Sequence, residues 1–410
     1  MSGTKRGGKL KGSAMKTKIS AAAESLRTEV TSFLREIIAI PSVCGNEGPV
    51  IERLKAEMED IGYDEIRIDG FGNLIGRLGK GKRIIAMDGH CDTVDVGNRS
   101  IWAVDPFQGD LRDGIIYGRG ASDQKGGLAS AVYAGKVLKS MGVPDDLTLL
   151  VVASAYEEDV EGLSWDYIIK EEGIRPEAVL LTEPSNLQLC TGQRGRMEMK
   201  VNTQGLSCHG SAPDRGDNAI YRMAPIIGDI EALHHRLESD SILGKGSVAI
   251  SDIRSTAPSL CAVADSCTVH LDRRLTEGET LETAIEEIQS LPSVVQSKAE
   301  VVVPRYETQT YTGLYYPSEA YFPPWLMERS HPLVETAEKA FESQFDAKAQ
   351  CGVWQFSTNG VTTKGVYDIP TIGFGPGAEE HAHTPKDQVK VDDLVQAMAF
   401  YVAFVLEMGR

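Results

Sequence analysis

The chain lacks several features that would place it in a membrane or outside the cell. It has no run of about 18 apolar residues, so no transmembrane helix is expected. Its basic N-terminus has no apolar stretch like that of a secretory signal, and residues 1–19 are predicted to form a disordered tail. The seven cysteines are scattered, odd in number and without a CxxC pair, which disfavours a disulfide framework and indicates a reducing cytoplasm.

Basic residues are also in the minority. The 42 lysines and arginines face 59 aspartates and glutamates, and the formal net charge is -17. A protein this acidic repels nucleic acid and anionic membranes, so neither is expected as a partner. A solvated surface explains most of the acid, although some carboxylates could bind cations. With 410 residues, 41% of them hydrophobic, the chain is long enough for two domains or more.

The hydrophobic pattern changes twice along a chain that has no internal repeats. Short apolar strands first alternate with amphipathic helices, with helices expected at 21–40, 49–61 and 126–141 and strands at 83–87, 147–153 and 178–181. A strand–helix–strand–strand–helix–strand block follows, with strands at 197–203, 247–253, 267–271 and 300–303 and helices at 218–237 and 281–291. The first pattern then returns, with helices at 333–345 and 391–408 and a strand at 371–374.

These patterns predict an α/β protein with two domains. The catalytic domain is expected to be discontinuous, comprising residues 20–193 and 306–410, with a mixed sheet flanked by helices. A small α+β sandwich of the ferredoxin-like type, residues 194–305, is expected to be inserted between the two parts.

The first candidate site residues are His90 and Asp92, which directly follow the strand at 83–87. Sheets of α/β proteins place their sites at such strand ends. A neutral imidazole binds divalent metals well, and a carboxylate two residues away is close enough to orient it. The alternative is a surface histidine in a turn.

Three carboxylates extend the pattern. Asp123 lies in the glycine-rich turn GRGASDQKGG just before a helix, where the alternative is a helix N-cap. Glu157 and Glu158 belong to the triplet EED, directly after the strand at 147–153. Neighbouring like charges are unfavourable without a cation, so one glutamate could bind a metal while the other serves as general base. The alternative is an acidic loop.

Two more strand ends carry ligand-type residues. Glu183 follows the strand at 178–181, and His381 and His383 follow the strand at 371–374, in a chain with only eight histidines. This recurrence predicts that the groups converge on one site with two nitrogen and three carboxylate ligands. Such a set suits two ions of Zn²⁺, Mn²⁺ or Co²⁺ rather than Ca²⁺.

In this order, the segments GHCDTV, GRGASDQKGG, EED, TEPS and AHTPKD resemble those of the M20 family of metallopeptidases and deacylases. The resemblance covers nearly the whole chain after the tail. It implies a zinc-peptidase-like catalytic domain and an inserted lid domain through which two copies form a homodimer. It also implies two divalent metal ions, with Zn²⁺ preferred and Co²⁺ or Mn²⁺ as alternatives. The subgroup that looks most similar is described as selenium-metabolism-linked hydrolases.

The resemblance implies a role for each candidate residue. Asp123 matches a ligand that bridges the two metals and precedes a cis peptide bond to Gln124. Glu157 matches the general base, and Asp92 the carboxylate that clamps the first ligand. The remaining metal ligands are matched by His90, Glu158, Glu183 and His383.

Residues outside the ligand set are also matched. His209 resembles a histidine that crosses the dimer interface and stabilises the oxyanion in the partner's site, and Arg274 an arginine that binds a substrate carboxylate. The alternatives are a loop histidine and a surface arginine on the lid. Asn359 stands where relatives commonly have an aspartate, and is expected to contact the substrate. Cys261 replaces an asparagine of relatives, so one substrate contact is missing or replaced.

The resemblance implies hydrolysis of an amide-type C–N bond in a small molecule. A glutamate at position 183 resembles deacylases and carboxypeptidases, whereas aspartate there resembles aminopeptidases and histidine resembles N-carbamoyl amino acid hydrolases. We therefore expect the substrate to be an N-acyl or ureido amino acid derivative or a peptide. The alternatives are a dipeptidase or aminopeptidase, an N-carbamoyl amino acid hydrolase, and a non-catalytic binding protein, which the intact ligand set and Glu157 disfavour.

Overall fold

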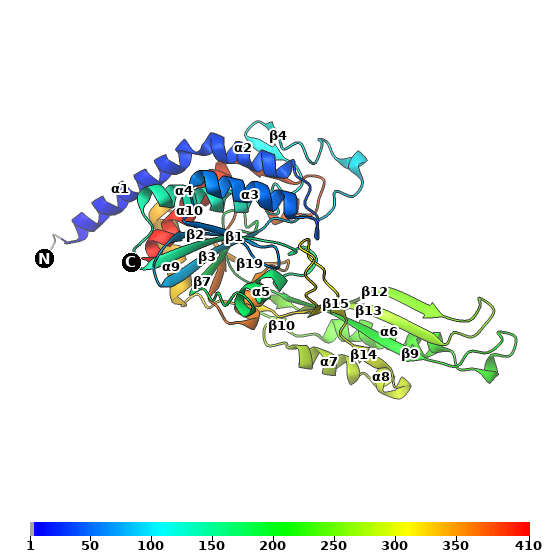
Figure 1. Ribbon diagram of the computed structural model, residues 1–410. Helices are drawn as coiled ribbons and strands as arrows, with labels where there is room; N and C mark the ends of the chain where they lie inside the picture. Colours follow the sequence, from blue (N-terminus) through cyan, green and yellow to red (C-terminus); the bar gives the residue numbers. More distant parts are fainter. Residues whose placement is uncertain (1–3) are drawn as a thin grey trace.

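The computed structural model of the protein describes residues 4–410. Figure 1 shows a sheet wrapped by helices, from which a narrower second part extends far to one side. Each part has its own cluster of buried apolar side chains. The two-domain α/β architecture predicted from the sequence is thus confirmed. Within residues 4–410, no helix has the length and apolar character needed to cross a membrane.

The larger part is built on a nine-stranded mixed sheet. Its strand order is β1 (Glu65–Ile68), β2 (Leu74–Gly79), β6 (Leu147–Ser154), β3 (Arg83–His90), β7 (Ala178–Leu181), β20 (Thr371–Gly373), β8 (Leu189–Gln193) and β18 (Trp325–Leu326), with β19 (Cys351–Trp354) also pairing with β8. β3 runs parallel to both β6 and β7, and β20 runs parallel to β7. All eight residues of β6 are buried, which explains its continuous apolar sequence. The carboxyl ends of these central strands therefore meet at one edge.

Helices cover the sheet. They are α2 (Arg27–Ile38), α3 (Gly48–Ile61), α4 (Lys125–Met141), α5 (Leu163–Lys170), α9 (Pro332–Phe345) and α10 (Val391–Met408). α4 packs on β3 and against α10, and most of its residues are buried. Local signals set the ends of the helices: α9 starts with Pro332, and α3 ends at Gly62 in the left-handed region.

The N-terminal segment differs from the prediction. A disordered tail was expected over residues 1–19, but α1 (Thr4–Ser25) is helical, and only residues 1–3 lie outside the described part. Met15, Ile19 and Ala23 recur every four residues, so they form one apolar stripe, which packs on the main core. Lys16 Nζ also lies 2.5 Å from Asp346 Oδ2. Tertiary packing stabilises a helix that the basic composition does not suggest.

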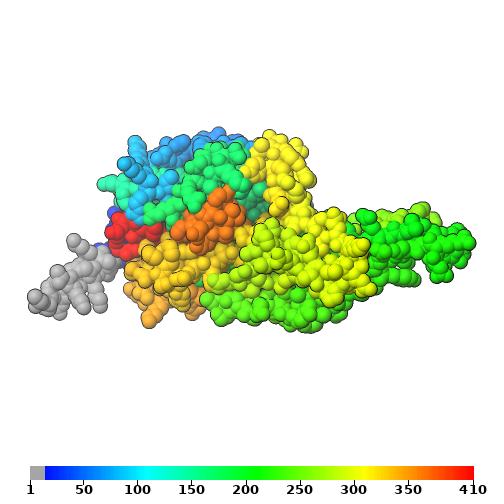
Figure 2. Space-filling view, turned by 90° about the horizontal axis from the view of Figure 1, so that it is seen from below, coloured from blue at the N-terminus to red at the C-terminus, as the bar shows by residue number. Residues whose placement is uncertain are grey.

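The second part, called the lid below, is a five-stranded antiparallel sheet with helices on one face. Its strand order is β12 (Ser247–Thr256), β13 (Ser266–Leu275), β9 (Gly195–Gln204) and β14 (Glu300–Val302), with β17 (Tyr321–Phe322) also pairing with β9. The helices are α6 (Ala219–Arg236), α7 (Leu281–Gln289) and α8 (Pro292–Ser297). This is the predicted ferredoxin-like order, and Figure 2 shows the same elongated outline from below.

Small elements complete the fold. They are β4 (Asp110–Arg112), β5 (Ile115–Tyr117) and β21 (Gln388–Lys390) in one sheet, the pairs β10 (Ser239–Asp240) with β11 (Gly244–Lys245) and β15 (Arg305–Tyr306) with β16 (Ser318–Glu319), and the short helices Arg99–Ile101, Pro213–Arg215, Val361–Val366 and Glu379–His381.

Candidate metal centre

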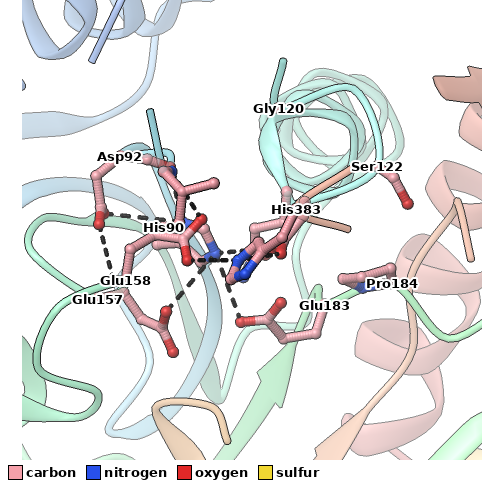
Figure 3. A network of polar contacts seen from close by, with 12 residues as sticks. His90, Asp92, Gly120, Ser122, Glu157, Glu158, Glu183, Pro184 and His383 are labelled. Carbon is pink, nitrogen blue, oxygen red and sulfur yellow. Dashed lines mark hydrogen bonds and ion pairs between the residues drawn. The ribbon is translucent and has the colours of Figure 1, made fainter. Parts of the chain in front are cut away.

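Three neighbouring strands deliver ligand-type side chains to one edge of the main sheet. His90 is the last residue of β3, Glu157 and Glu158 follow the end of β6, and Glu183 follows the end of β7. Because β3 lies between β6 and β7, these ends are adjacent. Figure 3 shows the side chains turned toward one another.

Asp123 reaches the same point from the turn before α4. The turn is held by the buried carboxylate of Asp387, which accepts hydrogen bonds from the backbone N–H of Gly120 at 2.7 Å and of Ser122 at 2.8 Å. Arg119 Nη1 lies 3.2 Å from the same carboxylate. The peptide bond between Asp123 and Gln124 is cis, as the resemblance implied.

The carboxylate of Asp123 lies between two imidazoles. Its Oδ1 is 3.1 Å from His90 Nε2, and its Oδ2 is 3.3 Å from His383 Nε2. His383 comes from the loop between β20 and β21, and its Nε2 also lies 2.8 Å from Glu158 Oε2. On the other side, His90 Nε2 is 3.8 Å from Glu157 Oε2 and 3.9 Å from Glu183 Oε1. One carboxylate therefore faces both histidines, one with each oxygen.

These groups fit divalent metal ions. One ligand atom from each of His90, Asp123 and Glu158 lies within 4.8 Å of the others, and the same holds for His90, Glu157 and Glu183. Glu157 Oε1 and Glu183 Oε2 are buried without a hydrogen-bond partner in the described chain. Buried charged oxygens need partners. Imidazole and carboxylate donors suit Zn²⁺, Mn²⁺ or Co²⁺.

The electrostatics show how crowded the negative charge is. Burial raises the pKa of Glu157 and of Glu183 well above that of an ordinary glutamate, and neighbouring carboxylates raise both further. Burial alone would lower the pKa of His90, but the facing carboxylates outweigh it and raise the pKa. Hydrogen bonds to Asp123 and Glu158 raise the pKa of His383 to about 10. Protons thus offset the charge here, and metal cations would replace them.

Asp92 adjoins His90 in a different way from the one expected. The ring Nδ1 lies 2.9 Å from the backbone carbonyl oxygen of Asp92 and 3.7 Å from its carboxylate Oδ1. The carbonyl therefore accepts the Nδ1 proton and leaves Nε2 free for a ligand role. The Asp92 carboxylate instead accepts the backbone N–H of Glu158 at 2.9 Å through Oδ2, so it aligns the ligand loop after β6.

The metal centre opens into a cleft of about 490 Å³ between the main sheet and the lid. Arg274 lines this cleft, and its Nε and Nη2 donate to the carboxylate of Asp272. Sequence reasoning missed Arg196 and Glu161 in the cleft wall, which form an ion pair of 2.6 Å between the lid and the loop after β6. The segments EEDVEG and QRGRM contain these charges, but nothing local indicates that they meet.

Asn359, which is predicted to contact the substrate, lies behind the cleft in this structure. Its side chain is buried and does not line the cleft. Nδ2 donates to Asp88 Oδ2 at 2.9 Å and to Ser154 Oγ at 3.0 Å, and Oδ1 accepts the backbone N–H of Gly162 at 2.8 Å. Both N–H donors of the amide are used within the fold, so Asn359 joins the strands behind the site.

His209 does not reach the cleft of its own chain. It lies in an exposed lid loop that pairs with Ala262, and its Nδ1 is 2.7 Å from Ser211 Oγ. The structure thus brings together the five predicted ligands, Glu157 and Arg274, but not His209 or Asn359.

The fold and the site together define a metallohydrolase with an inserted lid. The chain belongs to the peptidase family M20/M25/M40, whose sequence model matches residues 86–407. Members of this family typically carry a dinuclear metal centre, which agrees with the two ligand clusters.

Relatives support this membership. The uncharacterized protein YgeY of Escherichia coli K12 is 49% identical over 384 residues, which cover 94% of this chain and 95% of that protein. The succinyl-diaminopimelate desuccinylase of Stenotrophomonas maltophilia R551-3 is 31% identical over 48% of this chain and 55% of that protein. The structure of aminopeptidase PepT from Bacillus cereus ATCC 10987 has a TM-score of 0.72 at 20% identity, covers 94% of this chain and 99% of that chain, and shows the shared fold.

Proposed function

We propose that the protein hydrolyses an amide-type C–N bond in a small N-acyl or ureido amino acid derivative or peptide. The observation that carries this proposal is Glu157, a buried carboxylate beside the ligand cluster whose Oε1 has no partner in the described chain. Such a group, facing the cleft, is suited to accept a proton from an attacking water.

Two divalent metal ions, Zn²⁺ in first place and Co²⁺ or Mn²⁺ as alternatives, would be held by the five ligands and would acidify water and polarise the scissile carbonyl. Glu157 takes the proton from the attacking water and passes it to the leaving nitrogen. Its raised pKa, caused first by burial, suits a group that must also act as an acid.

Arg274 supports a substrate that carries a carboxylate. Asp272 holds the guanidinium through Nε and Nη2, so Nη1 remains to bind an anion in the cleft. Replacing Arg274 with Ala should raise KM for substrates with a free carboxylate and leave KM unchanged for the corresponding carboxamides. Equal changes for both substrate types would remove Arg274 from the substrate site.

We further propose that the enzyme works as a homodimer in the cytoplasm, with His209 of one copy completing the other copy's site. His209 is exposed on the lid and does not line the cleft of its own chain, which supports this. Mixing His209→Ala with Glu157→Gln subunits tests it, since one site of each heterodimer would then hold both native residues. Random mixing of the two inactive variants should restore about a quarter of the activity. No recovery, in a mixture shown to exchange subunits, would contradict the shared site.

The reaction itself is tested by a mass-spectrometric screen with the protein loaded separately with Zn²⁺, Mn²⁺ and Co²⁺. The panel holds N-acyl amino acids, ureido and N-carbamoyl amino acids, and dipeptides, with Glu157→Gln as control. Metal-dependent cleavage of N-acyl or ureido compounds, absent in the control, supports the proposal. Cleavage of dipeptides or N-carbamoyl amino acids alone would favour those alternatives, and ligand binding without any cleavage would favour a binding protein.

A further inference from the structure

A second cluster of ligand-type side chains lies beside the candidate metal centre. It consists of the Cys44 thiol and the carboxylates of Glu47 and Asp92, and one ligand atom from each lies within 4.8 Å of the others. Cys44 and Glu47 belong to the loop between α2 and α3, and Asp92 follows β3. The hydrolytic site described above uses neither Cys44 nor Glu47.

The two carboxylates of this cluster are buried and incompletely paired. Glu47 Oε1 accepts the backbone N–H of Tyr156 at 3.1 Å, but Oε2 has no partner in the described chain. Asp92 Oδ2 accepts from the Cys44 thiol at 3.2 Å, while Oδ1 has no partner within hydrogen-bond distance. Both residues are 0% exposed. Buried oxygens of this kind are costly unless a proton or a cation compensates them.

A proton compensates the buried charge of Glu47 and Asp92 less well than a cation does. Burial and the charge of Asp92 raise the pKa of Glu47 to about 8. A single proton on Glu47 Oε2 would neutralise only one of the two carboxylates, whereas a cation compensates both. A cation between the two carboxylates would use both unpaired oxygens, and the thiol would complete the set.

We propose that Cys44, Glu47 and Asp92 form a third metal site, which binds a thiophilic divalent cation such as Zn²⁺ or Cd²⁺. Cys44 releases its proton to solvent as its sulfur binds the metal. Sulfur distinguishes this site from the catalytic centre, whose ligand atoms are nitrogen and oxygen, and it favours soft cations. Besides burial, the charge of Asp159 raises the pKa of the Cys44 thiol. Asp159 lines the cleft, and Cys44 itself is only partly buried, so the cluster adjoins the cleft.

Filling this site should affect the catalytic centre through Asp92. The same Asp92 oxygen that accepts from Cys44 also accepts the backbone N–H of Glu158, a predicted ligand of the catalytic metals. A metal bound to Asp92 Oδ1 draws charge away from Oδ2, and the loss of the Cys44 proton removes one of the donors to Oδ2, so the loop that carries Glu158 shifts. We therefore expect excess Zn²⁺ to inhibit the enzyme, and Cys44→Ser to be less sensitive.

The test uses the full-length protein, stripped with a chelator and titrated with Co²⁺. A thiolate ligand gives a near-ultraviolet charge-transfer band that nitrogen and oxygen ligands do not give. Cys44→Ser removes the thiolate, and Glu47→Gln removes one charge but keeps the oxygen that accepts from Tyr156. Cys351→Ser is the matched control, because Cys351 is another partly buried free thiol in the larger domain. A parallel Zn²⁺ titration, read by elemental analysis, counts the bound ions.

We expect the wild type and Cys351→Ser to bind a third equivalent of metal and to show the thiolate charge-transfer band with Co²⁺. Cys44→Ser should lose the band, and both cluster variants should weaken the third equivalent by more than about tenfold, since even outer partners of ligands are worth ~10–100-fold. A titration that ends at two equivalents without the band overturns the proposal, as does an undiminished band in Cys44→Ser. If only the third site proves absent, the proposed function still stands, because the two ions of the catalytic centre and the hydrolysis reaction are measured separately.

Discussion

Two adjacent glutamates should respond in opposite ways to the same substitution. In Glu157→Gln, we expect turnover to collapse while both catalytic metals stay bound. In Glu158→Gln, we expect a metal to be lost first. The difference follows from their partners: Glu158 Oε2 lies 2.8 Å from His383 Nε2, whereas Glu157 has one oxygen 3.8 Å from His90 Nε2 and the other unpaired.

The size of each effect can be worked out. General base catalysis contributes about 10²–10⁴-fold, so kcat of Glu157→Gln should fall by at least about 100-fold. That corresponds to about 3–5 kcal/mol of transition-state stabilisation. Removing a direct ligand at Glu158 should weaken metal binding by more than the ~10–100-fold typical of outer partners. Gln has the same shape as Glu, so the fold is expected to persist in both variants.

The assay combines steady-state kinetics on the substrate class found in the screen with a count of bound metal after dialysis. Circular dichroism confirms that both variants are folded. Activity of Glu157→Gln above a few per cent of wild type would refute its role as base. Loss of metal from Glu157→Gln, with Glu158→Gln retaining both ions, would reverse the two assignments.

Three further predictions concern the scaffold of the site. Stripping the metals with a chelator should lower the melting temperature, because an ion present at 1,000 times its Kd stabilises the fold by about 4 kcal/mol; calorimetry with and without Zn²⁺ measures this, and an unchanged midpoint would contradict a resident metal. Asn359→Leu leaves Asp88 without its amide partner, so the free energy of unfolding in urea should fall by about 1–3 kcal/mol, with little change in KM. A large change in KM at unchanged stability would instead support Asn359 as a substrate contact. Asp387→Asn disrupts a buried pair with Arg119 and should lower the free energy of unfolding by about 3 kcal/mol or more; wild-type stability in urea would show that the turn does not depend on that carboxylate.

Much of the architecture could be predicted because local patterns and tertiary packing agree. The buried strand at 147–153, the helix at 126–141 and the ferredoxin-like block all form as expected, since their apolar periodicity matches their burial. The N-terminal helix was missed, because its basic composition hid an apolar stripe that becomes visible only once the core it packs on is known. Short strands such as β4 and β18 carry too few residues for a periodic signal.

Some residues of the candidate site could likewise be predicted from the sequence, and others could not. Its ligands could be found from the sequence because each follows a strand or a turn, and parallel strands bring their carboxyl ends to one edge. The cleft pair Arg196–Glu161 could not be found, because the two side chains belong to different domains and meet only through the docking of the lid. Nor does position in a motif say which way a side chain points, as the Asp92 carboxylate shows.

By itself, the sequence determined which residues could serve as ligands and base, because imidazoles and carboxylates recur after successive strands and turns of one sheet. Only the tertiary structure decided their partners: the two oxygens of Asp123 divided between two histidines, and Asn359 buried against Asp88, 271 residues away. The reason is physical. Residue type and local spacing set the chemistry that a side chain offers, whereas long-range packing sets its burial and its neighbours, and these decide whether it binds a ligand or supports the fold.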